Sequence, residues 1–300
     1  MPPGVGGYRQ INKALNICAF EDYLESQQNN LPELPDVEQF TLQGTNTFIV
    51  GTGPERLIID TGQGIPDWAD LLDHTLAENG ISLSHVLLTH WHGDHTGGVP
   101  DLIRMYPKLA PSIYKHSPSK TQQPIADGQI FKVEGATVRA VHTPGHSSDH
   151  MCFILEEEQA MFTGDNILGH GTSAVEHLST WMDTLHKMQS QGCVKGYPAH
   201  GIVIDNLRSK IAGELATKVR REKQVLKALV QAKCEEQGRG KSSVTVKQLV
   251  TSIYGDSVDG GVRQLALEPF MDEVLRKLAE DGIVAFEIRG GVKKWFVLEQ

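Results

Sequence analysis

The chain has 300 residues, 39% of them hydrophobic, and a formal net charge of −9. This length allows one large domain or two ordinary ones, and the apolar fraction is sufficient for packed cores. No run reaches the roughly 18 apolar residues of a membrane span, and residues 1–10 lack the apolar core of a signal peptide. We therefore expect no membrane partner and no secretion.

The charge is unevenly distributed. Residues 1–205 hold 11 Lys and Arg against 24 Asp and Glu (−13), and residues 206–300 hold 17 against 13 (+4). An acidic region repels a polyanion at long range, which argues against a nucleic-acid partner, although the basic region offsets this locally. The four cysteines show no paired spacing, so free thiols in a reducing compartment are the simplest interpretation, and we expect a cytoplasmic protein.

The elements before the first polar motif can be read from periodicity. In the N-terminal leader, residues 1–40, Ile11–Gln28 has helical spacing. Thr45–Val50 and Arg56–Ile59 flank a Gly-Pro turn, which predicts a hairpin. Pro66–Asn79 is amphipathic and predicts a helix. More strands are expected between about residues 113 and 163, and then a helix over Val175–Gln191.

Strands followed by helices, twice, fit an α/β fold with a four-layer αββα sandwich, which we expect over residues 41–205. The segment 206–300 differs in character and is expected to form a long helix plus a smaller domain. Its expected elements are a basic helix at 206–234, helices at Val246–Tyr254 and Leu265–Glu280, and hairpin strands at Ile283–Ile288 and Lys293–Leu298.

Helices followed by a β-hairpin resemble a winged-helix module. Its functional interpretation is nucleic-acid binding, and the alternative is a domain that shapes the substrate entrance. We favour the second, because the expected recognition segment Val262–Pro269 holds one basic residue, too few for strong phosphate contact. The basic cluster Lys218–Lys223 is either a solvated helix face or a docking site for a partner.

The most informative motif is Thr89-His90-Trp91-His92-Gly93-Asp94-His95, which follows an apolar strand end. Cations such as Zn²⁺ bind imidazole and carboxylate groups. A strand-end loop can aim His90 and His92 at one ion while Asp94 and His95 face another. Two ions need six or seven ligands, so further ligands are expected downstream in loop-like motifs. The candidates are His146 in TPGH, Asp165 in FTGD and His200 in YPAHG, the last expected after a helix.

This ordered set of motifs resembles the metallo-β-lactamase-fold hydrolases over roughly residues 40–205, and Leu57–Gly62 matches the first motif of that superfamily. The resemblance implies a first metal at His90, His92 and His146, a second at Asp94, His95 and His200, and a bridging Asp165. Two zinc ions are expected, with manganese or iron as alternatives. It also implies catalytic roles for Asp94 and Asp165, and a supporting role for Asp60, outside the metal ligands.

Several alternatives follow from the same motifs. A carboxylate at position 92 would suggest a di-iron relative, so His92 favours hydrolysis. A Cys ligand marks many antibiotic-degrading lactamases, but Cys193 is not needed when His200 completes the set. A single-iron dioxygenase with similar ligands stays open. His150 is more simply structural than a ligand, and His170 and Thr172 either touch substrate or belong to a flexible loop.

Among these hydrolases, the leader and the segments Leu42–Thr47 and Thr143–Met151 resemble the fungal thioesterases that release aromatic polyketides from a carrier protein, the atrochrysone-carboxyl type. The resemblance implies a polyketide thioester substrate on an acyl carrier protein domain of a polyketide synthase. The alternatives are a single-strand endoribonuclease and a small-thioester hydrolase of the glyoxalase II type. One departure is that about a dozen residues usual before Leu42 are missing, which predicts a bare edge of the first sheet.

Overall fold

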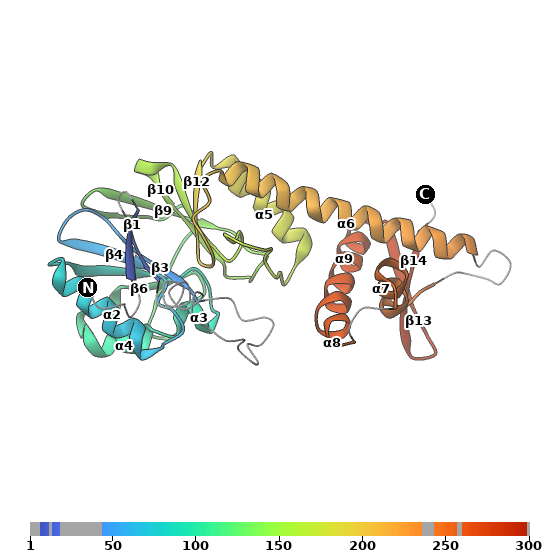
Figure 1. The fold of residues 1–300 in the computed structure, drawn as a ribbon, viewed down its shortest axis with the longest axis horizontal. Coiled ribbons are helices and arrows are strands. Elements are labelled where there is room, and N and C mark those ends of the chain that lie inside the picture. The colour runs from blue at the N-terminus through green and yellow to red at the C-terminus, as the bar shows by residue number, and fades with distance from the viewer. Residues whose placement is uncertain (1–6, 12–13, 19–43, 236–242, 257–259, 299–300) are drawn as a thin grey trace, which may run out of the picture. The chain divides into compact units, whose positions relative to one another are not determined.

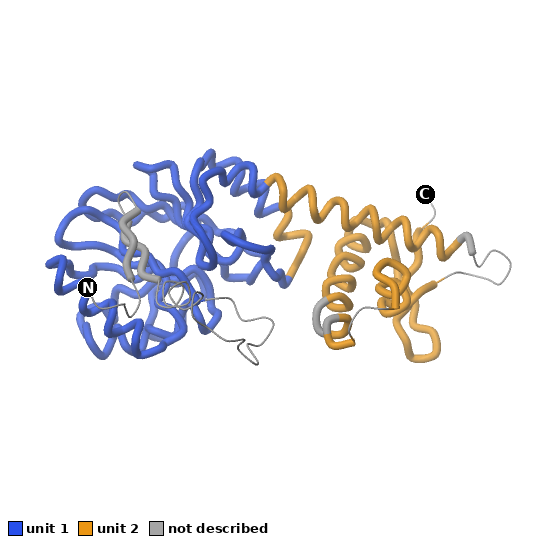
Figure 2. The backbone as a smooth tube through the Cα atoms, viewed as in Figure 1, with its two compact units in different colours: residues 1–176, 183–211 blue, residues 177–182, 212–300 orange. Residues whose placement is uncertain are grey.

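The computed structural model describes residues 7–11, 14–18, 44–235, 243–256 and 260–298. The chain divides into two compact units (Figure 2), the first made of residues 1–176 and 183–211, the second of residues 177–182 and 212–300. The division near residue 211 lies six positions beyond residue 205, where the sequence suggested it, and the second unit also takes the short segment 177–182.

The first sheet has seven strands in the order β1-β2-β3-β4-β5-β6-β7. Their bounds are Gly7–Ile11 (β1), Ala14–Cys18 (β2), Asn46–Val50 (β3), Glu55–Ile59 (β4), Ser82–Leu87 (β5), Ile113–Lys115 (β6) and Gln123–Pro124 (β7). The strands from β1 to β4 pair antiparallel, and those from β4 to β7 pair parallel.

The N-terminal hairpin corrects two expectations. Ala14–Cys18 is a strand that pairs with both β1 and β3, so the helix predicted over Ile11–Gln28 is wrong there, and residues 19–28 lie outside the described part. Leu15 and Ile17 also fit a period of two, and a short apolar run fits a strand as well as a helix. The predicted bare edge is absent at β3, because β2 pairs along it.

The second sheet has five strands in the order β12-β11-β10-β9-β8. Their bounds are Ile130–Val133 (β8), Ala136–His142 (β9), Met151–Leu155 (β10), Ala160–Gly164 (β11) and Lys195–Pro198 (β12). Its inner face packs against the first sheet in one buried cluster that includes Phe48, Leu57, Phe153 and Phe162. The ring centroids of Phe48 and Phe162 are 5.0 Å apart, so the two sheets are in direct contact.

Helices cover the outer face of each sheet (Figure 1). On the first sheet, helix α2 (Pro66–Glu78) and helix α4 (Val99–Met105) bury Trp68 and Leu102 against the outward side chains of β3 and β4. On the second, helix α5 (Leu178–Ser190) holds the strand ends through Thr184, which donates to the Pro144 carbonyl at 2.6 Å. The predicted four-layer αββα sandwich is confirmed.

The second unit contains the helices and the hairpin that the sequence predicts. Its elements are α6 (Leu207–Glu235, which starts in the first unit), α7 (Val246–Tyr254), α8 (Gly260–Val262), a π-helical turn (Arg263–Leu267), α9 (Glu268–Glu280), β13 (Val284–Arg289) and β14 (Val292–Val297). Thr245 and Gln248 form a capping box at the start of α7. Buried side chains from α6, α9 and β14, such as Leu229, Leu275 and Trp295, give this unit its own core.

No helix in the described part of the chain combines the length and the apolar character that crossing a membrane requires.

Candidate metal centre

Four of the polar side chains predicted for the site follow β5. The strand is buried at its end and paired parallel with β4 and β6, so the chain leaves the sheet at a fixed point. His90 and His92 lie in the loop that follows, and the short helix α3 (Gly93–Thr96) begins directly after them. Asp94 and His95 lie on this helical turn, and their ligand atoms belong to a second cluster, although the ring centroids of His90 and His95 are only 4.1 Å apart.

The other three come from the second sheet. His146 lies between β9 and β10, and Asp165 follows β11. His200 follows strand β12, not a helix as the sequence suggested, because Lys195–Pro198 pairs parallel with β11. Neighbouring parallel strands end at the same edge of a sheet, so Asp165 and His200 come together.

Three imidazoles and a carboxylate form the first cluster, with ligand atoms within 4.8 Å of one another. His90 Nε2 and His92 Nδ1 are 2.8 Å apart, and His146 Nε2 lies 3.2 and 3.0 Å from them. The Oδ2 atom of Asp165 is 3.5 Å from His146 Nε2. These spacings approach the roughly 3.3 Å expected between ligand atoms held about 2.0–2.1 Å from one tetrahedral zinc ion.

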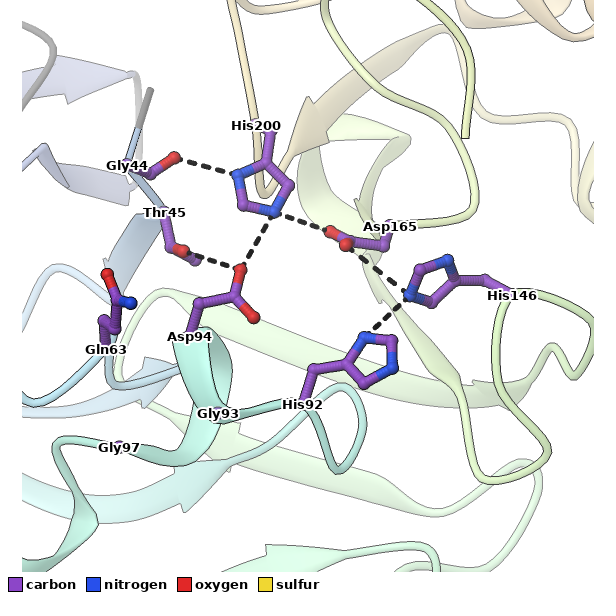
Figure 3. Close-up of a pocket in the computed structure, with 10 residues that line it drawn as sticks. All are labelled: Gly44, Thr45, Gln63, His92, Gly93, Asp94, Gly97, His146, Asp165 and His200. Atoms are coloured by element: carbon purple, nitrogen blue, oxygen red, sulfur yellow. Dashed lines mark hydrogen bonds and ion pairs between the residues drawn. The ribbon is translucent and has the colours of Figure 1, made fainter. Parts of the chain in front are cut away.

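Asp94, His95 and His200 form the second cluster. The Asp94 Oδ2 atom lies 3.3 Å from Nε2 of both His95 and His200. The Oδ1 atom of Asp165 lies 3.4 Å from His95 Nε2 and 3.2 Å from His200 Nε2. Asp165 therefore presents one carboxylate oxygen to each cluster (Figure 3), and the structure brings all seven predicted side chains together.

Unsatisfied buried atoms show that these clusters suit cations. His95 Nε2, His200 Nε2 and Asp165 Oδ1 are buried and make no hydrogen bond. Leaving such atoms without a partner costs free energy, and a bound cation removes this cost because lone pairs are what it coordinates. The imidazole and carboxylate groups of the two clusters fit a dinuclear metal site.

Backbone carbonyls set the orientation of two of these imidazoles. His146 Nδ1 lies 2.7 Å from the Ala174 carbonyl, and His200 Nδ1 lies 2.8 Å from the Gly44 carbonyl. A carbonyl only accepts, so both Nδ1 atoms carry protons, and in the neutral rings Nε2 is left with a free lone pair. In each case Nε2 is the atom that faces the cluster.

Asp60 supports the second cluster by contacting His95 at Nδ1, the ring nitrogen that does not face the cluster. Its carboxylate accepts from the Thr89 backbone N–H at 2.8 Å and lies 2.8 Å from His95 Nδ1. Thr89 Oγ1 donates to the same carboxylate and lies 3.0 Å from His90 Nδ1, so both clusters are linked to Asp60. Asp60 adopts a left-handed backbone conformation (φ 59°), which is uncommon for a residue other than glycine and is found at sites held by their surroundings.

The two clusters differ in their electrostatics. Burial and the neighbouring imidazoles lower the pKa of His90, and burial also lowers the pKa of His146. Burial opposes protonation of His200 too, but the Asp165 and Asp94 carboxylates beside its Nε2 atom outweigh burial and raise its pKa to about 9. Asp165 and Asp60 likewise outweigh burial at His95 and raise its pKa well above the usual value. Without metal, the second cluster binds protons at neutral pH.

A cavity of about 680 Å³ opens onto both clusters. Beyond the ligand candidates, Gly44, Thr45, Gln63, Gly93 and Gly97 line it (Figure 3). Thr45 Oγ1 donates to Asp94 Oδ2 at 3.2 Å. Burial alone would raise the pKa of Asp94, but the adjacent imidazoles of His200 and His95 lower it, so this partly exposed carboxylate is ionised at neutral pH.

His150 supports the site in a way that its sequence position did not reveal. It is buried, belongs to neither cluster, and its Nε2 accepts from the Asp165 backbone N–H at 3.0 Å. Thr45 also supports the site, through its hydrogen bond to Asp94. The only sequence signal for it was its place in the segment Leu42–Thr47. His170 and Thr172 are exposed and are not among the residues that line the cavity. Cys193 is a buried free thiol outside both clusters.

Comparison with known proteins identifies the family. Residues 40–192 match the family model described as the metallo-beta-lactamase superfamily. The match spans more than half of the chain, so this protein belongs to the metallo-β-lactamase superfamily and is a metal-dependent hydrolase of that class.

Curated relatives match along almost the whole chain. "Lactamase-like protein notP" of Aspergillus sp. (strain MF297-2) is 75% identical over 317 residues, covering 99% of each chain. "Atrochrysone carboxyl ACP thioesterase dmxR1" of Cryptosporiopsis sp. (strain 8999) is 72% identical over 317 residues, covering 99% of this chain and 98% of its own. These alignments are at least 17 positions longer than this chain, so the relatives hold residues that it lacks.

Solved structures agree on the fold. A beta-lactamase domain protein from Burkholderia ambifaria superposes with a TM-score of 0.73 at 15% identity, over 99% of this chain and 95% of its own. A metallo-beta-lactamase family protein from Thermus thermophilus gives a TM-score of 0.62 at 21% identity, over 87% of this chain and 96% of its own.

Proposed function

We propose that this protein is a dinuclear-metal thioesterase that hydrolyses the thioester joining an aromatic polyketide to an acyl carrier protein and releases the free acid. The observation that carries the proposal is the pair of ligand clusters that share Asp165 at the floor of one cavity. Relatives that are 72% and 69% identical over nearly the full length are named atrochrysone carboxyl ACP thioesterases.

The seven side chains would serve as ligands for two ions. His90, His92 and His146 would hold the first ion, Asp94, His95 and His200 the second, and Asp165 would bridge them. Two bound ions supply a nucleophile from water at neutral pH and polarise a carbonyl oxygen. We favour zinc, because tetrahedral zinc readily takes imidazole and carboxylate ligands, and manganese and iron are the alternatives.

Asp94 is the residue best placed to handle a proton. Its carboxylate is ionised, 35% exposed toward the cavity, and oriented by the hydroxyl of Thr45. It would orient a water molecule in the cavity and accept its proton, as a general base must lie within hydrogen-bond reach of the group it serves.

The lining of the cavity suits a thioester. No Lys, Arg or Tyr occurs among the described residues that line it, so it offers no cationic clamp for a phosphodiester. A thiolate leaves readily without a proton donor, whereas an amine needs one. A volume of about 680 Å³ is in the range that holds drug-sized ligands, as a polycyclic aromatic acyl group requires.

We also propose that the protein acts in the cytoplasm, where polyketide synthases and reduced thiols coexist. The support is that Cys152 and Cys193 are free, buried thiols.

The test is hydrolysis of an aromatic β-ketoacyl thioester by the zinc-loaded protein. The wild type is expected to release thiol continuously, whereas Asp165→Ala is expected to lose turnover by roughly a thousandfold or more, because both clusters lose a ligand. Asp183→Ala is the matched control, since Asp183 is an exposed carboxylate on α5 outside both clusters.

Retained turnover in Asp165→Ala would show that the reaction does not require the carboxylate that the two clusters share. If the wild type binds two ions yet hydrolyses no thioester, the proposed substrate class is wrong, and single-stranded RNA becomes the next substrate to assay.

A further inference from the structure

The exposed face of helix α6 in the second unit carries an unusual arrangement of charge. Arg220, Lys223 and Lys227 are all exposed and are spaced i, i+3 and i+7, which places them on one side of the helix. Val225 and Leu229 are buried on the opposite side. Between residues 212 and 233 the acidic residues are Glu214, which is buried, and Glu222, which pairs with Lys277 at 3.0 Å. The exposed charges on this stretch are therefore all positive.

Like charges on one helix face destabilise it. Pairs of cations at i,i+3 and i,i+4 each cost roughly 0.2–0.5 kcal/mol, and no ion pair is recorded for Arg220, Lys223 or Lys227 within the described part of the chain. Arg220 donates to the Thr217 hydroxyl of its own helix, which neutralises nothing. The fold of the second unit does not need these three cations on this face.

Apolar side chains flank the cations. Val219 is 37% exposed and Val230 is 47% exposed, and helical spacing places both along one edge of the basic stripe. These aliphatic side chains can contact apolar side chains of a partner that the cations attract. We name this surface, made of Val219, Arg220, Lys223, Lys227 and Val230, the α6 face.

The structure removes two members of the basic cluster that the sequence suggested for docking. Lys218 is 4% exposed and lies over the rings of Trp181 and Phe270, each 5.1 Å from its Nζ atom. Arg221 is partly buried and lies over the rings of Tyr254 and Phe270. These two cations stabilise the second unit from inside, so they are unsuitable as docking residues.

We propose that the α6 face is the docking surface for the acyl carrier protein that bears the substrate, an inference that rests on the proposed function. Carrier proteins are acidic, and their prosthetic arm is joined through an anionic phosphodiester. Residues 1–205 carry a net charge of −13 and repel such a partner at long range, so docking needs a local positive surface. The α6 face supplies one, with valines that can contact apolar carrier side chains.

A nucleic acid fits this unit less well. Helix α9, which begins at the end of the segment Val262–Pro269 that the sequence suggested for recognition, carries Glu268, Asp272, Glu273 and Glu280. Its cations are neutralised, because Arg276 pairs with Glu273 and Lys277 pairs with Glu222 and Asp281. Strong phosphate binding requires several unpaired cations. The α6 face offers only three, and two exposed valines lie beside them, so it suits a protein better than a nucleic acid.

The experiment compares two substrates with the same acyl group, one on an isolated acyl carrier domain and one on a short free thiol. The full-length triple variant Arg220→Glu/Lys223→Glu/Lys227→Glu is expected to lose roughly tenfold or more in kcat/KM for the carrier-bound substrate, mainly through KM. Its kcat/KM for the free thioester should stay within about twofold of wild type, because the α6 face lies outside both clusters. Added salt should slow the carrier reaction of the wild type and leave that of the variant nearly unchanged.

The matched control is Lys108→Glu/Lys120→Glu/Lys132→Glu, which changes the net charge equally at exposed positions of the first unit. An equal loss in the control, or unchanged carrier kinetics in the α6 variant, would overturn the proposal. Direct titration of the carrier domain onto wild type and variant separates this inference from the proposed function. Carrier binding lost in the variant supports the α6 face even if no thioester is cleaved, and binding of single-stranded RNA in place of the carrier would refute it.

Discussion

The two ligand clusters share Asp165 but differ in how they hold protons. His90 and His146 in the first cluster are biased toward the neutral form by burial, whereas carboxylates bias His95 and His200 in the second toward the protonated form. Neutral imidazoles bind metal directly, while protonated ones must first release their protons. One cavity therefore contains a first cluster whose neutral histidines are ready to bind a cation, and a second cluster in which protons compete with the cation for the histidines.

Removal of metal is expected to have the largest effect. A chelator should reduce thioester turnover to background, and the loss should coincide with the first ion removed, because protons replace the cation most readily at His95 and His200. Metal content and turnover measured on the same samples check this. Turnover that persists until the second ion leaves would show that one ion is sufficient, which contradicts a reaction that needs both.

Single ligand variants should separate the clusters. His200→Ala is expected to retain one ion and to lose turnover by on the order of 10²–10³-fold, because the first cluster stays complete. His90→Ala should instead weaken the site that binds metal more tightly. Isothermal titration with Zn²⁺ measures both stoichiometries. If both variants show the same loss, the clusters do not bind independently.

The pH dependence of metal binding should also differ. The pKa of His200 is about 9, so this ring is protonated below pH 9 and its proton must leave when metal binds. The affinity of the weaker site should therefore fall by about tenfold or more for each pH unit below 9, since each displaced proton adds that factor. The tighter site should vary less between pH 8 and pH 7. Competition titrations against a chelator at several pH values measure the zinc affinity of each site. If the two affinities change equally with pH, this account is wrong.

A smaller effect is expected from the residue behind the second cluster. Asp60→Asn keeps the shape of the side chain but removes the charge that faces His95 Nδ1. The affinity of the weaker site, or turnover, should fall about 10- to 100-fold, as is common for partners of metal-binding histidines. Asp73→Asn serves as a control at an exposed carboxylate that accepts from the Tyr106 hydroxyl. An unchanged zinc affinity in Asp60→Asn would mean that Thr89, whose Oγ1 atom lies 3.3 Å from His95 Nδ1, is sufficient to orient the His95 ring.

The sandwich and the ligand set were predictable because their signals are local. Two short apolar segments on either side of a Gly-Pro turn marked β3 and β4, and the spacing of polar residues in Thr89–His95 marked the centre of the site. The pairing of β2 with β3 was not predictable, since Ala14–Cys18 fits both periods and its partner lies about 30 residues away along the chain. Apolar alternation did not separate a strand from a helix without that partner.

The support around the ligands was harder to predict for the same reason. His150 contacts Asp165 across the sheet, and Lys218 is buried by aromatic rings from α5 and α9. Both roles depend on tertiary contacts, whereas periodicity describes one element at a time. A basic run such as Lys218–Lys223 therefore divides into buried and exposed cations only when its helix is packed.

The most direct test of a two-metal thioesterase is a zinc titration of the metal-free protein in which bound ions and turnover of an aromatic acyl thioester are measured together. We expect two equivalents of zinc to bind, with turnover that appears as the second equivalent fills its site and that Asp165→Ala does not show. Binding that saturates at one equivalent, or two bound ions without thioester turnover, would contradict the account.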